Sequence, residues 1–485
     1  MAIVYTCAVL YFLGMGFIFL YSLAQGHLLL HFFKFRKTEK QVPYLIPNPW
    51  PKVTVQLPIY NELYVVERLI DAVAKLNYPS ELLQIQILDD STDLTSDLIQ
   101  AKLLAYSTIN FQYLHRTNRQ GFKAGALREA LPTAEGEFVA IFDADFVPDP
   151  DFLIKALPYF SSPQVGMVQS RWTHLNQNYS ILTELQAFAL DAHFLIEQQG
   201  RNQQGAFINF NGTAGIWRKT CILDAGNWHD DTLTEDLDLS YRAQRKGWKF
   251  VYRPEIESPA ELPPILSAIK SQQFRWTKGG AECAVKHAGK VFQEDHSWHI
   301  KFHAFAHLFN STIFIAILLT SFCSIGIWWG IQSNLISAKL LLATGFSMFG
   351  FVLVAGVYLV SYLKAQAFSW SRLAEAIWKL PLFFAVSMGF ALHNSQAVWE
   401  GLTGKKSPFI RTPKFNLESG TVSLNTNVYR LRSLPLSTWL EGGMGLLFGG
   451  MVVLGIVFGT YLFLPFHGLL ALGYSLVFIS SLRTR

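Results

Sequence analysis

Apolar residues gather in long runs at both ends of the 485-residue chain and in short runs between them. The first run begins at Ala2 and continues to about residue 30, and roughly 20 apolar residues are enough to span a bilayer. This run is too long for the apolar core of a cleavable leader, so residues 1–33 are predicted to form an N-terminal transmembrane helix. Later apolar runs predict spans at about 307–331, 337–363, 437–460 and 462–482.

The pattern changes at about residue 53, where charged residues become frequent and apolar stretches become short. Strand candidates lie at 53–57, 85–88, 138–142 and 166–169, and helical patterns lie between them, for instance at 63–76 and 121–131. This alternation predicts an α/β fold with a mostly parallel sheet over residues 53–290. Residues 34–52, which include LIPNPWP, are predicted to be an extended linker, and residues 263–290 a helix at the membrane surface.

The stretch 371–402 is ambiguous, because it is long enough to cross a membrane but contains Lys379, Pro381 and His393. If it crosses, the basic segment GKKSPFIRTPKF lies outside; if it lies in the interface, that segment is cytoplasmic. We favour an interfacial helix. The basic cluster HFFKFRKTEK marks the cytoplasmic side, which gives five spans with the N-terminus outside. The C-terminal half is thus predicted to hold an interfacial segment with two spans (291–363), the interfacial helix (371–402), a loop (403–430) and two spans (437–482).

Composition supports a membrane protein, since 51% of the residues are hydrophobic and only 15% are charged. Average soluble chains carry roughly 25% charged residues. The net charge of +5 forms no basic stripe, so a nucleic-acid partner is not expected. The four cysteines form no C-x-x-C or Cys/His pattern, which is typical of free thiols in a domain that faces the cytosol.

Polar clusters follow three of the predicted strands: PIYNE, DDSTD and DADF. Ligands of open α/β sheets bind outside the carboxyl ends of the strands, so these clusters are expected to converge on one crevice. Asp143 and Asp145 in DADF can share a divalent cation such as Mg²⁺ or Mn²⁺, although the same tripeptide also serves as a turn or cap. Asp90 can accept a hydrogen bond from a nucleobase or ribose, while Asp93 can cap the next helix. Lys123, which follows Gly121 into a helix, can bind a phosphate.

The segment TLTEDLDLS carries the candidate base. Asp236 is predicted to take the proton of an acceptor hydroxyl, beside Glu235 and Thr234. The alternative is a capping box, with Thr234 as the cap and a solvated first turn. In QQFRWTKG, one helix face presents Gln272, Arg275 and Trp276, where the Arg-Trp pair can hold a diphosphate and stack on a sugar. The alternative there is an arginine and a tryptophan at the membrane interface.

The order D, DxD, TED, QxxRW resembles that of membrane-embedded family 2 glycosyltransferases, which include cellulose, chitin and hyaluronan synthases. FNGTAGIWR, VQSRW and GFKAGAL resemble the plant cellulose synthase-like A and C proteins, which make β-mannan and β-glucan backbones. The resemblance implies a GT-A-like domain at 53–290, with Asp143 and Asp145 as metal ligands and Asp236, Glu235 and Thr234 as the catalytic group. It places the donor nucleotide sugar at Pro58, Tyr60, Glu62, Asp90, Lys123, Asp143, Arg275, Thr412 and Lys414. The acceptor and its channel are placed at Asn211, Gly212, Gln272 and Trp276.

Residues 409–414, FIRTPK, resemble the F-x-V-T-x-K gating loop of bacterial cellulose synthase. Arg411 replaces the valine, whereas Thr412 and Lys414 keep their places and are expected to lie over the nucleotide. The F-x-C-G acceptor motif of that family appears here as Phe210-Asn211-Gly212, so the acceptor pocket is expected to differ.

These features favour a processive, inverting β-glycan synthase that also moves its polymer through the membrane. UDP-glucose is the first donor expected and GDP-mannose the next. The alternatives are a ceramide glucosyltransferase-like enzyme, which transfers one sugar to a membrane lipid, and a transporter with a nucleotide-sensing domain. The expected setting is the plasma or inner membrane or the Golgi, with membrane lipids as neighbours and room for accessory subunits.

Overall fold

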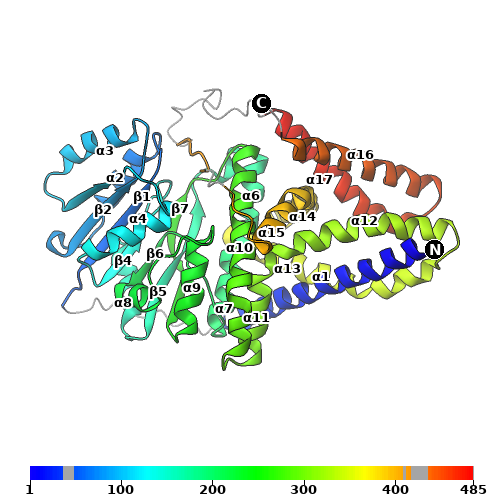
Figure 1. Cartoon of the computed structure of the whole chain (residues 1–485), viewed down its shortest axis with the longest axis horizontal. Coiled ribbons are helices and arrows are strands. Elements are labelled where there is room, and N and C mark those ends of the chain that lie inside the picture. Colours follow the sequence, from blue (N-terminus) through cyan, green and yellow to red (C-terminus); the bar gives the residue numbers. More distant parts are fainter. Residues whose placement is uncertain (36–48, 408–410, 417–434, 484–485) are drawn as a thin grey trace.

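The computed structural model describes residues 1–35, 49–407, 411–416 and 435–483. An α/β domain lies at one end of the molecule and a bundle of long apolar helices at the other, with the N-terminus at the tip of the bundle (Figure 1). Most of the predicted linker at 34–52 and most of the predicted loop at 403–430 fall outside the described residues.

The α/β domain is built on a mixed sheet of seven strands among the described residues, in the order β3-β2-β1-β4-β6-β5-β7. β6 pairs antiparallel with both β4 and β5, and the other pairs are parallel, as the sequence predicts for most of the sheet. The strands are β1 (Val53–Ile59), β2 (Leu83–Asp89), β3 (Phe111–His115), β4 (Phe138–Ile141), β5 (Val165–His174), β6 (Gly215–Arg218) and β7 (Lys249–Ala260).

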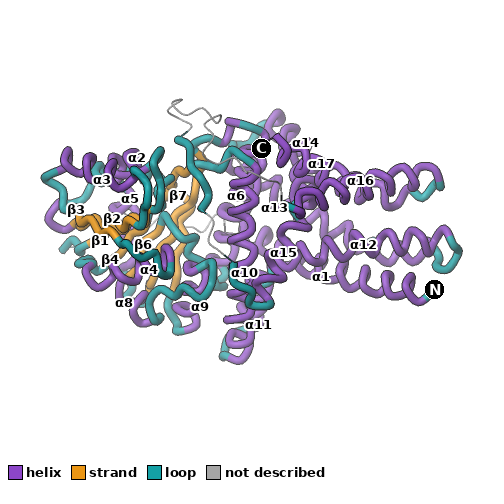
Figure 2. Tube along the Cα trace, turned by 45° about the horizontal axis from the view of Figure 1, so that its top comes forward, coloured by secondary structure: helices purple, strands orange, loops and turns teal. Residues whose placement is uncertain are grey.

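Apolar side chains alternate between the two faces of the sheet and build a core on each. On β1, Val53, Val55 and Leu57 belong to one core, while on β4 Val139 and Ile141 belong to the other. The helices that cover these faces are α2 (Val66–Val73), α3 (Thr95–Leu103), α4 (Phe122–Ala130), α5 (Phe152–Ala156), α8 (Lys219–Asp224) and α9 (Glu235–Arg245). Figure 2 shows the strands enclosed between these helices.

Two helical runs join the α/β domain to the bundle. α6 (Ile181–Ala192) continues through a π-helical turn (His193–Gln198) into α7 (Gln199–Gln203), and this run packs against the first helix of the bundle. The 28-residue helix α10 (Leu266–Gln293) also lies along the boundary (Figure 1). Helix α10 covers most of the helix predicted at 263–290 and begins three residues later, while its place at a membrane surface stays a prediction.

The bundle consists of α1 (Ala2–Phe35), α11 (Trp298–Leu308), α12 (Ile313–Gln332), α13 (Phe346–Ala365), α14 (Trp370–Gly389), α15 (Ala391–Leu402), α16 (Leu436–Val457) and α17 (Leu464–Arg483). Among the described residues, five helices are long and apolar enough to cross a membrane, at 2–34, 310–332, 338–365, 436–457 and 461–483. These match the five predicted spans. The ambiguous stretch 371–402 forms α14 and α15, which bend by 49° and count as a sixth span if taken together.

Candidate active site

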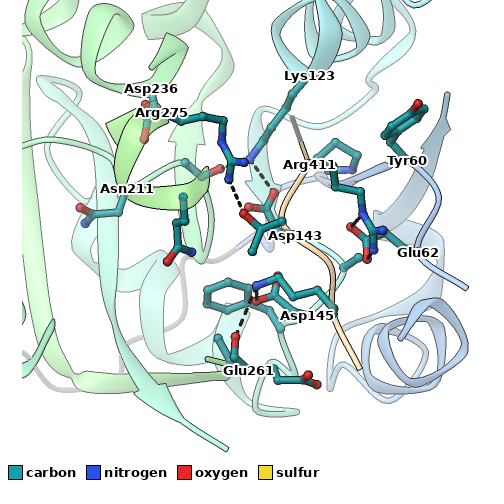
Figure 3. A pocket seen from close by; sticks show the side chains of 18 of the residues that line it. Tyr60, Glu62, Lys123, Asp143, Asp145, Asn211, Asp236, Glu261, Arg275 and Arg411 are labelled. Carbon is teal, nitrogen blue, oxygen red and sulfur yellow. Dashed lines mark hydrogen bonds and ion pairs between the residues drawn. The ribbon is translucent and has the colours of Figure 1, made fainter. Parts of the chain in front are cut away.

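The pocket of interest lies where the three polar strand ends meet helices α9 and α10. Its walls include Pro58 near the end of β1, Tyr60 and Glu62 after β1, Asp90 after β2, Lys123 on α4, Asp143 and Asp145 after β4, Asn211 and Gly212, Thr234, Glu235 and Asp236, Gln272, Arg275 and Trp276, and Thr412 and Lys414. All the candidate residues of the sequence analysis thus line one cavity, part of which appears in Figure 3.

Each carboxylate of the DAD tripeptide forms an ion pair with a lysine. The ammonium of Lys123 lies 2.5 Å from Asp143 Oδ1, and that of Lys414 lies 2.5 Å from Asp145 Oδ2. Burial raises the pKa of the Asp143 carboxyl, Lys123 opposes this shift, and Asp145 adds to it. Two acidic groups at a buried strand end therefore require positive charge, which is the condition that a divalent cation meets. Their oxygens are also the ligands that Mg²⁺ and Mn²⁺ prefer, so the pair fits such an ion.

A second acidic cluster is less suited to a metal. Ligand atoms of His229, Asp231 and Asp238 lie within 4.8 Å of one another. However, His287, Arg242 and Lys286 already contact Asp238 at 2.8, 2.8 and 2.7 Å, and they hold the pKa of its carboxyl far below the usual range despite burial. Cationic side chains neutralise both acidic clusters, but His229, Asp231 and Asp238 do not line the pocket, whereas Asp143 and Asp145 do, so the DAD pair remains the candidate metal site.

The candidate base stands in the first turn of α9. Burial and the adjacent Glu235 carboxylate raise the pKa of Asp236, so this side chain can hold a proton near neutral pH. Thr234 occupies the N-cap position, but its hydroxyl faces the Cys283 sulfur at 3.5 Å instead of capping the helix. The capping-box alternative is therefore wrong for Thr234. A close approach to α10 explains this orientation, since a Cβ on Gly279 would come within 2.5 Å of the Thr234 methyl group.

Gly212 allows the backbone to pass beside the base. Its φ is +83°, which favours glycine, and a Cβ at this position would lie 3.2 Å from Asp236 Oδ2. The Gly212 carbonyl also accepts a hydrogen bond from Lys123 at 2.9 Å. One lysine thus connects the DAD strand end to the segment that faces Asp236.

Helix α10 supplies the cationic wall. Arg275 donates from Nη2 to the Thr412 hydroxyl at 2.8 Å, so the helix contacts the segment 411–416 directly. Burial lowers the pKa of Arg275 to about 10, which leaves the guanidinium charged at neutral pH. In Figure 3, Arg275 lies between Asp236 and the Asp143–Lys123 pair.

The segment 411–416 closes the pocket from the opposite side. The Arg411 guanidinium binds Glu62, whose pKa burial raises to about 7 against the opposing charge of Arg411. The backbone N–H groups of Phe415 and Asn416 donate to the Glu261 carboxylate at 2.8 and 2.9 Å. Residues 409 and 410 of the predicted gating loop lie outside the described part of the chain.

At the end of the pocket formed by β1, β2 and α4, charged side chains already pair with one another. Arg116 forms a two-pronged bond with Asp90, at 2.7 and 2.6 Å. Arg119 stacks on the Tyr60 ring, with its Cζ 3.3 Å from the ring centre. Asp90 is therefore a buried, charge-compensated acceptor, consistent with contact to a base or ribose.

Trp172, His174 and Glu261 also line the pocket, and the sequence analysis gave none of them a role. Glu261 follows β7 directly, at the same edge as the three polar strand ends. The signal that marks the other clusters would have found it, had β7 been recognised as a strand.

Residues 51–279 match the family model described as "Glycosyltransferase like family 2". Over 239 residues the chain is 44% identical to a probable glucomannan 4-beta-mannosyltransferase 7 of Oryza sativa subsp. japonica, which covers 48% of this chain and 41% of that protein. It is 40% identical over 287 residues to glucomannan 4-beta-mannosyltransferase 7 of Arabidopsis thaliana, covering 56% of this chain and 52% of that protein. The chain thus spans about half the length of the curated relatives it matches.

Among solved structures, the mannosyltransferase PcManGT of Pyrobaculum calidifontis, in complex with GDP-Man and Mn²⁺, aligns with a TM-score of 0.54 at 19% identity. The alignment covers 82% of this chain and all of that one. The two proteins share a fold.

Proposed function

We propose that this protein transfers mannose from GDP-mannose to a growing β-glycan, since residues 51–279 match the model of "Glycosyltransferase like family 2". The observation that carries the proposal is the single pocket that holds the DAD pair, Asp236 and the Arg275–Trp276 pair together. The names of the relatives at 40–44% identity support mannose as the sugar. GDP-mannose, the second choice from the sequence, is therefore placed before UDP-glucose.

In the proposed reaction, the oxygen of an acceptor hydroxyl attacks the anomeric carbon of the donor, and Asp236 takes the proton of that hydroxyl. The bond from that carbon to the nucleoside diphosphate breaks on the opposite face, so the configuration inverts. The raised pKa of Asp236 suits this role, because a base works best when its pKa is near the working pH.

The departing diphosphate carries the charge that the pocket must neutralise. Lys123, Arg275 and Lys414 line the cavity and can contact its oxygens. A Mg²⁺ or Mn²⁺ ion, held by Asp143 and Asp145, would add charge stabilisation when bound. In the structure these carboxylates already attract the ammonium groups of Lys123 and Lys414, so those two lysines are the groups best placed to move onto the diphosphate.

The segment 411–416 is proposed to cover the bound donor. Thr412 and Lys414 are buried within the pocket, and the segment is attached to both sides of it through Glu62 and Arg275. A closed cover excludes water, which both prevents hydrolysis of the donor and strengthens the electrostatic contacts.

The bundle is proposed to hold the protein in a Golgi or plasma membrane, with the α/β domain in the cytosol and a path for the polymer between the helices. α10 supports this arrangement, because the helix that presents Gln272 and Trp276 to the pocket also packs against α15 of the bundle.

The test is a donor panel with the purified full-length protein. GDP-mannose is expected to yield a long product that an endo-β-1,4-mannanase degrades, while Asp236→Asn protein yields none. Turnover of UDP-glucose alone would overturn the choice of donor. A product of one sugar on a lipid would overturn polymerisation in favour of the ceramide glucosyltransferase-like alternative.

A further inference from the structure

A partly buried polar chain runs from the pocket wall to α1, the first helix of the bundle. His193, in the π-helical turn, places Nε2 3.1 Å from the side-chain oxygen of Asn211 and Nδ1 3.2 Å from a Glu197 oxygen. The other Glu197 oxygen accepts from Gln25 of α1 at 2.8 Å. One imidazole thus joins a pocket residue to a carboxylate that is fixed from the membrane side.

The π-helical turn makes this connection possible. A turn with one extra residue changes the direction of the side chains that follow it, and such turns occur frequently at functional sites. Here the turn directs His193 to the Asn211 side chain, while Gln198 donates to the Asn209 carbonyl at 2.8 Å. Asn209 in turn donates from its amide to Asn211 Oδ1 at 2.8 Å. The loop at 209–212 is therefore held from behind at two points.

The sheet holds the same loop from the other side. Gln169 of β5 accepts from the Asn211 N–H at 3.0 Å. The next residue, Gly212, faces the carboxylate of Asp236. Figure 3 shows Asn211 on the Asp236 side of the pocket, across Asp143 from Tyr60 and Glu62. Asn211 is thus on the side where an acceptor hydroxyl must approach its base, away from the nucleotide end.

Several charged and polar contacts fix the position of the Glu197 carboxylate. Burial by itself raises the pKa of this carboxyl, but His193 and Arg201 together hold it below the usual range. Arg201 is nearly buried and lies 3.7 Å from Glu197. Loss of the carboxylate charge would leave buried cationic and polar groups poorly compensated, so the imidazole would lose its fixed orientation.

We propose that His193 and Glu197 are positioning residues for the acceptor: Glu197 orients the His193 ring, which holds the Asn211 side chain beside Asp236 for a sugar hydroxyl. This inference rests on the proposed function, since it assigns the acceptor side of that same pocket. Neither residue belongs to the donor-binding wall.

The experiment separates acceptor binding from donor binding in the full-length protein. β-1,4-Manno-oligosaccharides serve as primers, and the Michaelis constants for primer and for GDP-mannose are measured separately. The variants are His193→Ala, Glu197→Gln and the conservative His193→Gln, whose amide can still donate to Asn211. His299→Ala is the matched control, because this histidine lies on α11, where its contacts are Ser297 and the Gln204 carbonyl.

Loss of one positioning hydrogen bond is expected to raise the primer KM about tenfold for His193→Ala and Glu197→Gln. The donor KM should stay within about twofold, and His193→Gln should recover part of the loss. An unchanged primer KM, or an equal rise in both constants, would overturn the inference. Wild-type protein that ignores primers but glycosylates lipid would instead refute the proposed function, and the same comparison of KM values would then be made with that lipid.

Discussion

Replacing Glu261 with glutamine tests whether the segment 411–416 must be docked for turnover. The Glu261 carboxylate is only 3% exposed and accepts the N–H groups of both Phe415 and Asn416. Glutamine keeps the size and one acceptor oxygen, but its NH₂ group would face the second N–H, donor against donor. Arg68, 3.6 Å away, would also lose its buried charge partner.

The expected magnitude follows from these contacts. A hydrogen bond to a charged group contributes about 1.5–3 kcal/mol, and each ~1.4 kcal/mol is a factor of ten. Loss of one such bond should therefore weaken docking about 10- to 100-fold. If only the docked segment supports catalysis, the turnover number of Glu261→Gln should decrease about 10- to 100-fold relative to wild type. Steady-state release of the nucleoside diphosphate, followed at saturating donor, measures it.

The matched control is Glu257→Gln on the same strand. Its side chain is about half exposed and pairs with Arg171 at the surface, away from the segment. An exposed pair contributes little, so this variant should keep at least half of the wild-type rate. Wild-type turnover in Glu261→Gln, or an equal loss in Glu257→Gln, would refute the docking argument.

Asp236→Asn should lower turnover by about 10²–10⁴-fold with nucleotide binding intact; near-normal turnover would show that Asp236 is not the base. Because this base must be ionised and its pKa is raised, the wild-type rate should increase with pH along a limb well above the ~3.9 of an ordinary aspartate; a limb at that ordinary value would contradict the assignment. Activity should require Mg²⁺ or Mn²⁺ and Asp145→Ala should abolish that response, so an undiminished rate in EDTA would exclude a metal there. Gly212→Ala forces a Cβ toward the base at positive φ, which costs about 1–3 kcal/mol; turnover should drop about 10- to 100-fold, and a wild-type rate would show that the loop yields easily. A cysteine at Lys406, in a background without the native thiols, should react with an impermeant maleimide only from the cytosolic side; labelling from outside would mean that α14 and α15 cross the bilayer.

The sequence pattern predicts those parts of the fold in which local hydrophobicity and position agree. The five candidate spans stand out as long apolar runs, and strands β1, β2, β4 and β5 each contain a short, mostly apolar stretch. β7 does not, because Pro254 and Pro259 and several charges interrupt it, yet it pairs with β5 across a register shift. Pairing with β5 stabilises β7 as a strand although its own composition does not favour one, and the pattern of one sequence does not show which strands pair.

The candidate site divides in the same way. Asp143, Asp145 and Asp236 stand in short motifs with recognisable chemistry, so the sequence singles them out as candidates, and the structure brings them to one pocket. The contact between Lys414 and Asp145 joins positions 269 residues apart, and the bond between His193 and Asn211 depends on a π-helical turn. Neither contact can be predicted from the spacing of its residues in the sequence, because three-dimensional packing alone brings these groups together.

Helix α10 has a consequence for how such proteins can diversify. Its early turns bear Gln272 and Trp276, while Lys278 and Ala281 pack so closely on Gly401 that a Cβ there would lie 2.6 Å from the Lys278 carbonyl oxygen. Inserting one residue between these two sets would rotate one against the other by about 100°, since a turn contains 3.6 residues. The α/β domain and the bundle therefore cannot be exchanged independently of each other. Recombination that joins halves from different ancestors must keep this helix whole, whereas loops away from it are free to vary in length.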